Sequence, residues 1–322
     1  MPLRATVSLD LDDLWTYLKT RGDERWVTYP SYLSTFVPRV LDMLDLLGLR
    51  ITVFVVGQDA ADPDKALWLR AIALRGHEIA SHSFAHDCWL HQYSAADLDR
   101  ELARAEEAIE SATGHRPTGF RAPGFSWSPV LPEVLSRRGY RYDASTLPTM
   151  LGPLARAYFL RSARLNRQQR EQRSGLFGSF SEATRPLRPY TWAVGDGRQL
   201  LEIPVTTMPF TRIPFHLSYL VYLRGFSWAL MAAHLRMSLG LCRAVGLEPS
   251  FLLHPLDILD ALEAPGLEFF PGMRLAKEEK KTVFCYALQT IQKQFETTLM
   301  GEFAQTHDRS RPVAARPYAE VP

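Results

Sequence analysis

Acidic and imidazole side chains stand where apolar runs of this sequence end. Asp10 and Asp12 close the apolar run 5–11, and His82 and His86 follow another short run. One carboxylate and two imidazoles can bind a divalent ion and leave coordination positions open, as a catalytic site requires. The four-residue spacing of the histidines is common among metal ligands, since it puts two rings on one side of a helical turn. By itself, this spacing favours two surface or core histidines.

The acidic cluster favours the metal interpretation. Alternate side chains of a strand share a face, so we expect Asp10 and Asp12 to point one way and Asp13 the other. Two carboxylates at the mouth of an apolar strand are costly unless they are paired or bound to metal. In the alternative interpretation, Asp12 or Asp13 caps the helix that follows.

Three further residues could take part in chemistry. Arg121 could pair with an aspartate through both carboxylate oxygens and hold it in position, although a lone arginine is usually solvated. Gly124 suits a turn in which a backbone N–H closely approaches a ligand. His254 ends the apolar run 251–253, where the alternative is a histidine packed in the core.

Short apolar runs alternate with helical patterns, which predicts a parallel α/β sheet, either open or closed into a barrel. Strands are predicted at residues 5–11, 51–56, 78–81, 140–143, 200–205 and 251–254, with another starting at Phe120. Helices are predicted at 35–47, 63–75 and 128–138, with one more between a Ser94 cap and Gly114. The candidate residues then lie at strand ends, where such folds place their active sites.

Residues 147–192 interrupt this alternation and form a basic insertion. Within it, Leu151, Leu154, Ala155 and Tyr158 recur at helical spacing. The arginines of the segment are Arg156, Arg161, Arg164, Arg167, Arg170 and Arg173. A basic amphipathic helix can lie on an anionic membrane surface, or it can pack on the barrel with a solvated basic face.

Residues 213–242 are rich in apolar side chains but contain histidines and arginines. A membrane-spanning helix needs about 20 mostly apolar residues, so we expect a buried or interfacial helix here. Residues 305–322 are polar and proline-rich, and we expect a disordered tail.

Composition narrows the class of protein. The net charge of +2 gives no overall nucleic-acid signature. Three scattered cysteines favour neither a disulfide framework nor a thiolate metal site. The strand pattern begins at once and leaves no room for a signal peptide, which predicts a cytoplasmic protein.

Together these motifs resemble the polysaccharide deacetylase family, carbohydrate esterase family 4. The order Asp-x-Asp, His-x-x-x-His, Arg-x-Pro, Asp and Leu-His spans residues 7–254. The resemblance implies an α/β fold, a distorted (β/α)7-type barrel, here with the insertion. It would form one catalytic domain over residues 1–304, with a single divalent ion, Zn²⁺ by expectation.

The resemblance also implies roles for individual residues. Asp10 would be the general base, and Asp12, His82 and His86 the metal ligands. His254 would be the general acid, with Asp143 orienting it and Arg121 orienting Asp10. The substrate-binding candidates are Gly124, whose backbone N–H would help to hold the oxyanion, and Phe125 and Trp127, which could stack on a sugar.

Three departures from the family pattern affect these assignments. Leu11 separates two aspartates that are usually adjacent, a form similar to lipid-linked aminoarabinose deformylases and some peptidoglycan deacetylase-like proteins. Gly124-Phe125 reverses the usual aromatic-glycine order, and Leu147 stands where a tryptophan is expected. The base and the ligand could also shift from Asp10 and Asp12 to Asp12 and Asp13.

The expected function is a metal-dependent amidohydrolase that removes an N-acetyl or N-formyl group from an amino sugar. The sugar would be lipid-linked, reached from the inner membrane face by peripheral contact. One alternative is a hydrolase of a linear amide or cyclic ureide, similar to allantoinase. Another is a sugar-binding homologue without activity, which the joint presence of Asp10, Arg121 and His254 disfavours.

Overall fold

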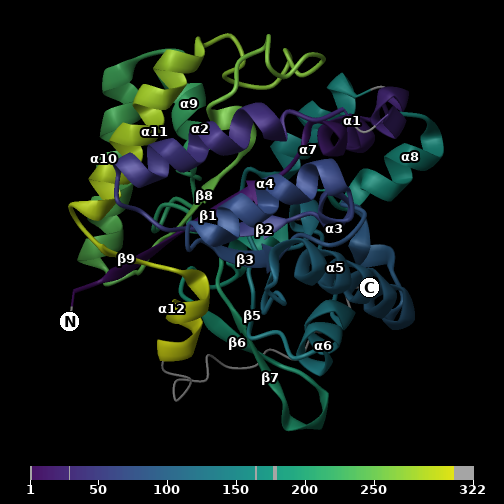
Figure 1. Cartoon of the computed structure of the whole chain (residues 1–322). Helices are drawn as coiled ribbons and strands as arrows, with labels where there is room; N and C mark the ends of the chain where they lie inside the picture. Colours follow the sequence, from purple (N-terminus) through teal and green to yellow (C-terminus); the bar gives the residue numbers. More distant parts are fainter. Residues whose placement is uncertain (1, 29, 164, 177–179, 308–322) are drawn as a thin grey trace.

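A single, mostly parallel sheet forms the centre of the molecule (Figure 1). The computed structural model describes residues 2–28, 30–163, 165–176 and 180–307. The strands run in the order β6–β7–β5–β4–β3–β2–β1–β8, and β9 also pairs with β1. Their bounds are β1 Arg4–Leu11, β2 Thr52–Val55, β3 Glu78–Ser81, β4 Gly119–Phe120, β5 Tyr142–Asp143, β6 Tyr190–Ala193, β7 Gln199–Glu202, β8 Ser250–Leu253 and β9 Glu296–Thr298. Among these pairs, β6 with β7 is antiparallel and the others are parallel.

Helices surround the sheet (Figure 1). Their bounds are α1 Leu14–Arg21, α2 Leu33–Leu46, α3 Gly57–Ala60, α4 Pro63–Leu74, α5 Ala95–Thr113, α6 Val130–Arg137, α7 Gly152–Ser162, α8 Arg167–Gln172, α9 Leu217–Arg224, α10 Trp228–Ala244, α11 Lys277–Gln292 and α12 Met300–Thr306. Helices α2, α4 and α5 each lie between consecutive parallel strands, as the right-handed crossovers of α/β folds require. Their apolar faces, such as Leu98, Leu102, Ala105 and Ile109 of α5, are buried as predicted.

Strand β1 is buried on both faces. Val7, Leu9 and Leu11 belong to the large hydrophobic cluster between the sheet and the helices. Ser8 and Asp10 alternate with them and are buried on the opposite face, where Arg121 reaches both. The interior of the curved sheet therefore carries polar groups at the level of β1.

The two ends of the strand order approach each other. After β7, the backbone N–H of Thr206 donates to the carbonyl of Ser250 in β8, at 3.0 Å. The N–H of Ser250 donates in return to Thr206 Oγ1, at 2.8 Å. These bonds bring the chain after β7 to the far edge of the sheet, and the predicted barrel-type fold is confirmed.

The predicted strands and helices are present, with ends that differ by a few residues. The insertion contains α7 and α8, and β6, which lengthens the sheet by an antiparallel strand. The single helix expected in 213–242 is two helices, α9 and α10, separated at Gly225. Of the helices that the structure describes, none is both long and apolar enough to cross a membrane.

The predicted tail, 305–322, falls mostly outside the described residues, which end at His307. Gln305 and Thr306 are the last residues of α12. The prediction of one catalytic domain over 1–304 stays a prediction.

Candidate metal and catalytic site

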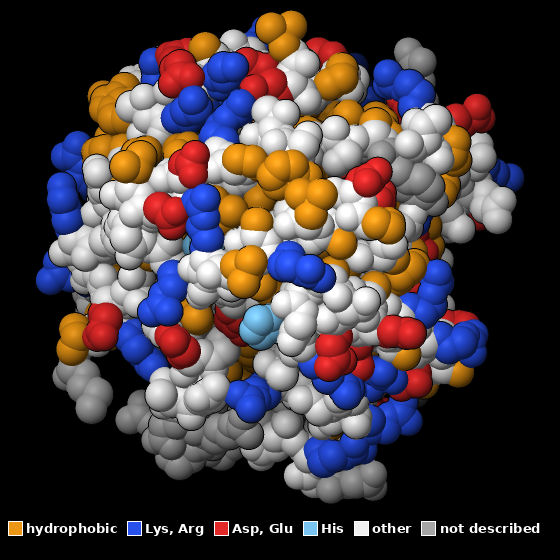
Figure 2. Space-filling model, in the orientation of Figure 1, with side chains coloured by type: hydrophobic (Ala, Val, Ile, Leu, Met, Phe, Trp, Pro, Cys, Tyr) orange, Lys and Arg blue, Asp and Glu red, His pale blue; other side chains and the backbone are white. Residues whose placement is uncertain are grey.

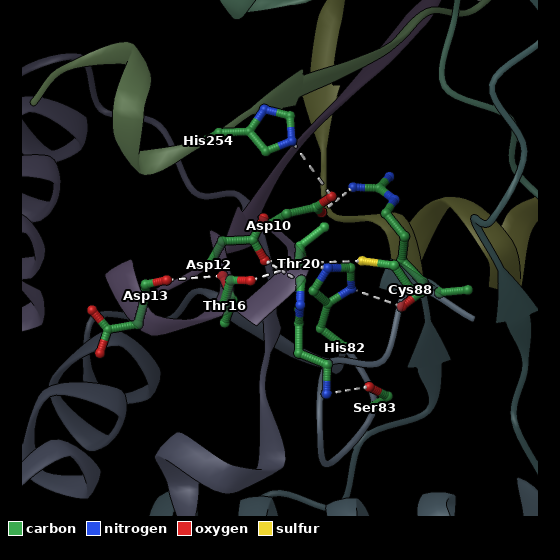
Figure 3. A network of polar contacts seen from close by, with 12 residues as sticks. Asp10, Asp12, Asp13, Thr16, Thr20, His82, Ser83, Cys88 and His254 are labelled. Atoms are coloured by element: carbon green, nitrogen blue, oxygen red, sulfur yellow. Dashed lines mark hydrogen bonds and ion pairs between the residues drawn. The ribbon is translucent and has the colours of Figure 1, made fainter. Parts of the chain in front are cut away.

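Residues from three strands meet at the carboxyl edge of the sheet. Asp10 lies in β1 with Asp12 just beyond its end, His82 follows β3, and His254 follows β8. Figure 3 shows these four side chains turned toward a common space. Because the strands are parallel, residues that directly follow them reach the same edge, which explains why distant segments converge.

Asp12, His82 and His86 are close enough to share one ion. Asp12 Oδ1 lies 2.9 Å from His86 Nε2 and 3.4 Å from His82 Nε2. One ligand atom from each of the three residues lies within 4.8 Å of the other two, and all three residues are buried. The donor set of one carboxylate and two imidazoles is that of a catalytic metal centre.

The two histidines are held by a loop, so the helical turn that their spacing predicts is wrong. Ser83 and His86 have positive φ angles of 64° and 53°, which do not occur inside an α-helix. Glu101 of α5 accepts the backbone N–H groups of Phe84 and Ala85, at 2.9 and 2.6 Å. This buried carboxylate fixes the loop, so the two rings can meet despite its irregular backbone.

Hydrogen bonding orients His82. Its Nδ1 lies 2.7 Å from the carbonyl oxygen of Arg121, which can only accept. Nδ1 therefore carries the proton, and the lone pair of Nε2 faces Asp12. A backbone carbonyl on the far nitrogen is a usual support for a metal-binding histidine.

The charges of this trio fit a cation. Burial opposes ionisation of Asp12, but the nearby histidines outweigh burial and hold its pKa well below the usual range. Burial lowers the pKa of His86, but Asp12 more than offsets this and raises it to about 10. Among the described residues, Asp12 Oδ1 and both ring nitrogens of His86 are buried without a hydrogen-bond partner other than the ion pairs of Asp12 Oδ1 with His82 Nε2 and His86 Nε2. Such groups are costly unless an ion completes them, so the residues present fit a divalent metal.

Arg121 contacts Asp10, as predicted, but through one hydrogen bond and not two. Its Nη1 donates to Asp10 Oδ1 at 2.6 Å and to Ser8 Oγ at 3.0 Å. Its Nε donates to the carbonyl of Ala144 at 3.0 Å, and its guanidinium lies 4.2 Å from the ring centre of Phe54. These contacts fix the guanidinium, which in turn fixes the Asp10 carboxylate.

Asp13 belongs to a different cluster, which disfavours the shifted assignment of base and ligand. Its Oδ2 lies 3.0 Å from Lys65 Nζ, and that amine also contacts Asp59 Oδ1 at 2.7 Å. Trp15 Nε1 donates to the same Asp59 oxygen. The Asp13 side chain points away from Asp10 and Asp12 (Figure 3), and its Oδ1 caps α1 by accepting the N–H of Leu14.

His254 faces Asp10, but its expected partner lies elsewhere. His254 Nε2 is 3.9 Å from Asp10 Oδ2, and its Nδ1 is 3.2 Å from Ser218 Oγ.

The Asp143 carboxylate, the expected partner of His254, instead accepts a hydrogen bond from the Ser145 hydroxyl. Burial and the nearby Glu202 carboxylate raise the pKa of Asp143 well above its usual range. Among the described residues Asp143 does not contact His254, so the predicted pairing is corrected here.

The substrate-binding candidates differ in their surroundings. Gly124 has a φ of 59°, and a Cβ there would lie 2.8 Å from Leu176 of the insertion, so glycine is required. Phe125, with a φ of 57°, is half-buried beside it. Trp127 stacks on Trp192 with ring centres 4.8 Å apart and packs on a hydrophobic cluster, which favours the core interpretation of this residue.

The insertion packs against the loop that follows the ligands. Arg173, which is buried, donates to the carbonyls of Lys19 and Thr20 and lies 4.5 Å from the ring centre of Trp89.

The sequence patterns did not indicate these contacts of Arg173, nor the contacts of Lys65, Asp59 and Ser218. A sequence signal is visible for Asp257, which lies three residues after His254 and accepts its N–H at 2.8 Å.

Known proteins with similar sequences include polysaccharide deacetylases. Residues 5–142 match the family model described as polysaccharide deacetylase. The chain is 33% identical over 129 residues to a chitin deacetylase of Colletotrichum lindemuthianum, an alignment that covers 38% of this chain and 50% of that protein. Across the curated relatives it matches, the chain covers half of their length or less.

Solved structures show the same fold. A Mycobacterium smegmatis protein assigned to the polysaccharide deacetylases superposes with a TM-score of 0.61 at 22% identity, over 99% of this chain and 97% of that one. PuuE allantoinase superposes with a TM-score of 0.55 at 16% identity, over 94% and 91% of the two chains.

Proposed function

We propose that the chain, whose residues 5–142 match the polysaccharide deacetylase model, is a metal-dependent hydrolase of N-acylated amino sugars. The catalytic unit would extend over residues 1–304, because His254 lies far beyond the matched segment. The observation that carries the proposal is the meeting of Asp10, held by Arg121, with the ligand-type trio and His254 at one edge of the sheet.

Asp12, His82 and His86 would hold the metal, for which Zn²⁺ suits the two imidazoles and one carboxylate. When bound, a divalent cation polarises the amide carbonyl and makes a water molecule easier to deprotonate. Asp10 would accept the proton of the attacking water at its carboxylate. Arg121 keeps that carboxylate in place and leaves one of its oxygens, Oδ2, directed toward His254.

The remaining groups would act on the amide itself. A backbone N–H near Gly124 would donate to the oxyanion as the carbonyl carbon becomes tetrahedral, a contact worth roughly 3 kcal/mol. His254 would then give the proton on Nε2 to the departing amine as the C–N bond breaks. In this mechanism Asp10 would be the base and His254 the acid, on opposite sides of the reacting carbon.

The test is the release of acetate from oligomers of N-acetylglucosamine by the purified protein. Activity that is lost after chelation and restored by a divalent ion would support the proposal. An N-formylated amino sugar tests the acyl group, and allantoin tests the ureide alternative. Hydrolysis of allantoin without hydrolysis of either sugar would replace the proposal, and binding without turnover would support the non-catalytic alternative.

We further propose that the amino sugar is lipid-linked and is reached from the inner face of the membrane by peripheral contact. The predicted apolar stripe on α7 is largely exposed: Leu154 is 66% and Tyr158 55% accessible. Arg161 and Arg167 nearby are exposed too. Exposed apolar side chains beside arginines suit an anionic lipid surface better than a helix packed on a barrel.

A neighbouring turn adds to this surface. Phe210 is 77% exposed with a φ of 70°. The carbonyl of Arg212 in the same turn accepts the Thr149 hydroxyl at 3.0 Å, which ties the turn to the start of α7. Figure 2 shows charged side chains of both signs among the hydrophobic ones on one face of the molecule. Arg164 lies outside the described residues.

A further inference from the structure

The ring of His254 is held between two elements. Strand β8 ends just before it, and the turn Pro255–Asp257 begins just after it. Nε2 faces Asp10, at 3.9 Å (Figure 3), while Nδ1 lies 3.2 Å from Ser218 Oγ at the start of α9. The ring therefore has one nitrogen toward the reacting groups and the other toward a hydroxyl.

Asp257 contacts the backbone of the same histidine. Its Oδ2 accepts the backbone N–H of His254 at 2.8 Å, and the side chain is buried. Burial raises the pKa of Asp257, but the charge of His254 and a hydrogen bond from Ser218 oppose that rise. The Ser218 hydroxyl lies 3.2 Å from the imidazole nitrogen Nδ1, and a hydroxyl can accept from one group while it donates to another, here the carboxylate of Asp257.

The other ionisable groups around this unit do not compete for Nδ1. His216 lies with its ring centre 6.3 Å from that of His254, and burial together with the charge of His254 lowers its pKa to about 3. It is therefore neutral in ordinary buffers. Lys280 is buried against the turn, where its amine donates to the carbonyls of Leu256 and Leu259. These bonds anchor the turn that carries Asp257.

We infer that Ser218 and Asp257 are the positioning residues of the general acid, in the place that the sequence assigns to Asp143. The inference rests on the proposed function, in which His254 protonates the departing amine. Ser218 Oγ accepts the Nδ1–H of His254 and donates its own hydrogen to Asp257. The ring is thereby fixed with Nδ1 protonated in both of its protonation states, so the proton that leaves is the one on Nε2.

In many hydrolases, a carboxylate that accepts the Nδ1–H of a catalytic histidine holds the ring in the correct tautomer and orientation. Here a serine hydroxyl would stand between the imidazole and the carboxylate. As the C–N bond breaks, Nε2 gives its proton to the amine nitrogen and keeps the electron pair of the N–H bond. Nδ1 keeps its proton and its bond to Ser218. A ring without this support would rotate or change tautomer, and Nε2 would leave its position near Asp10.

The first readout does not depend on activity. Protein labelled with ¹⁵N-histidine gives the Nδ1 and Nε2 resonances of His254, assigned by their loss in His254→Gln. We expect Ser218→Ala to change these shifts, because Nδ1 loses its acceptor, and Ser218→Thr to keep them. Ser238→Ala is the matched control, since it removes a buried serine hydroxyl of α10 that donates to the backbone carbonyl of His234 and not to a ring nitrogen. Unchanged shifts in Ser218→Ala, or a change produced by Asp143→Asn instead, would overturn the inference.

The second readout separates positioning of the acid from general structure. The amide of an N-acetylated sugar needs a protonated leaving group, whereas 4-nitrophenyl acetate releases a phenolate that does not. We expect Ser218→Ala and Asp257→Asn to lower kcat for the amide by about 10–100-fold, a part of the roughly 10²–10⁴-fold worth of a positioned acid. KM and the hydrolysis of the ester should stay near their original values, and Ser218→Thr should restore the amide rate.

Equal losses on amide and ester would indicate a structural role and reject the inference. A wild-type protein that hydrolyses no amide would contradict the proposed function and not the geometry, since the ¹⁵N shifts would still report whether Ser218 holds His254.

Discussion

Arg121 Nη1 lies 2.6 Å from Asp10 Oδ1, and the two side chains are 0% and 5% exposed. They come from β1 and from the residue after β4, two strands that do not pair with each other. Each of these buried charges depends on the other. Removal of one would leave the other buried without an oppositely charged side chain in hydrogen-bond contact, which would lower the stability of the fold.

Replacement of Asp10 by asparagine should abolish most activity without loss of metal. Asp10 is the proposed base and lies outside the trio that would hold the ion, so Asp10→Asn should lower kcat by about 10²–10⁴-fold. Metal analysis by mass spectrometry and acetate release from the same preparation check this. A metal-free Asp10→Asn protein would mean that the roles of Asp10 and Asp12 must be exchanged.

Removal of Arg121 alone should destabilise the fold by about 3–5 kcal/mol, because it leaves the Asp10 carboxylate buried without its partner. Urea unfolding of Arg121→Met measures this. The double variant Arg121→Met/Asp10→Asn should regain part of the loss, since it no longer buries a charge. A double variant that is no more stable than Arg121→Met would show that the charge pair is not the cause.

Removal of one imidazole should empty the metal site. His82→Ala deletes a ligand of the proposed trio, and the metal content per chain should fall several-fold below that of the wild type. His115→Ala is the control, since His115 is an exposed residue at the end of α5, away from the strand ends. Equal metal content in His82→Ala and the wild type would reject the site.

The stability of the protein should depend on pH through Asp59. Burial and the neighbouring Asp13 carboxylate raise the pKa of Asp59 to about 7, from 3.8 in an unfolded chain. The folded state then binds this proton more tightly, so the stability that the group contributes is complete below pH 3.8 and is lost as the pH rises through 7. Asp59→Asn should flatten this dependence in urea unfolding at pH 5 and 8, and parallel slopes would refute it.

Vesicle binding tests the exposed surface of α7. The protein should co-sediment with anionic vesicles and not with neutral ones, and salt should release it. Each arginine near such a surface contributes about 1 kcal/mol, so Arg161→Glu/Arg167→Glu should weaken binding about tenfold or more. Arg75→Glu/Arg100→Glu makes the same change in net charge on α4 and α5, and equal weakening by this pair would leave only a general charge effect.

The sequence predicts the strands well, and also that Asp12, His82 and His86 meet, because both depend on local signals. An apolar run such as 51–56 has few alternatives to a buried strand, and polar residues directly after such runs must lie at the sheet edge. The spacing of His82 and His86 predicts a helical turn, since spacing alone cannot show that Glu101 binds the backbone of this loop.

Contacts between side chains of different helices cannot be predicted from local sequence patterns. Lys65 meets Asp13 and Asp59 only because α1, α3 and α4 pack together. Motif order predicts Asp143 as the partner of His254, but that aspartate ends β5, four strands along the sheet from β1. Ser218 carries no motif, and its role arises from the place where α9 begins.

The pairing of β1 with both β2 and β8 affects the order in which the sheet can form during synthesis. During synthesis the amino-terminal part of a chain leaves the ribosome first and begins to fold. Asp12, His82 and His86 all lie within the stretch that emerges early, whereas Thr6 and Val7 of β1 must wait for Ser250 and Phe251. The nascent chain can therefore bring Asp12, His82 and His86 together before His254 is synthesised. The proposed acid joins the site only when β8 pairs with β1.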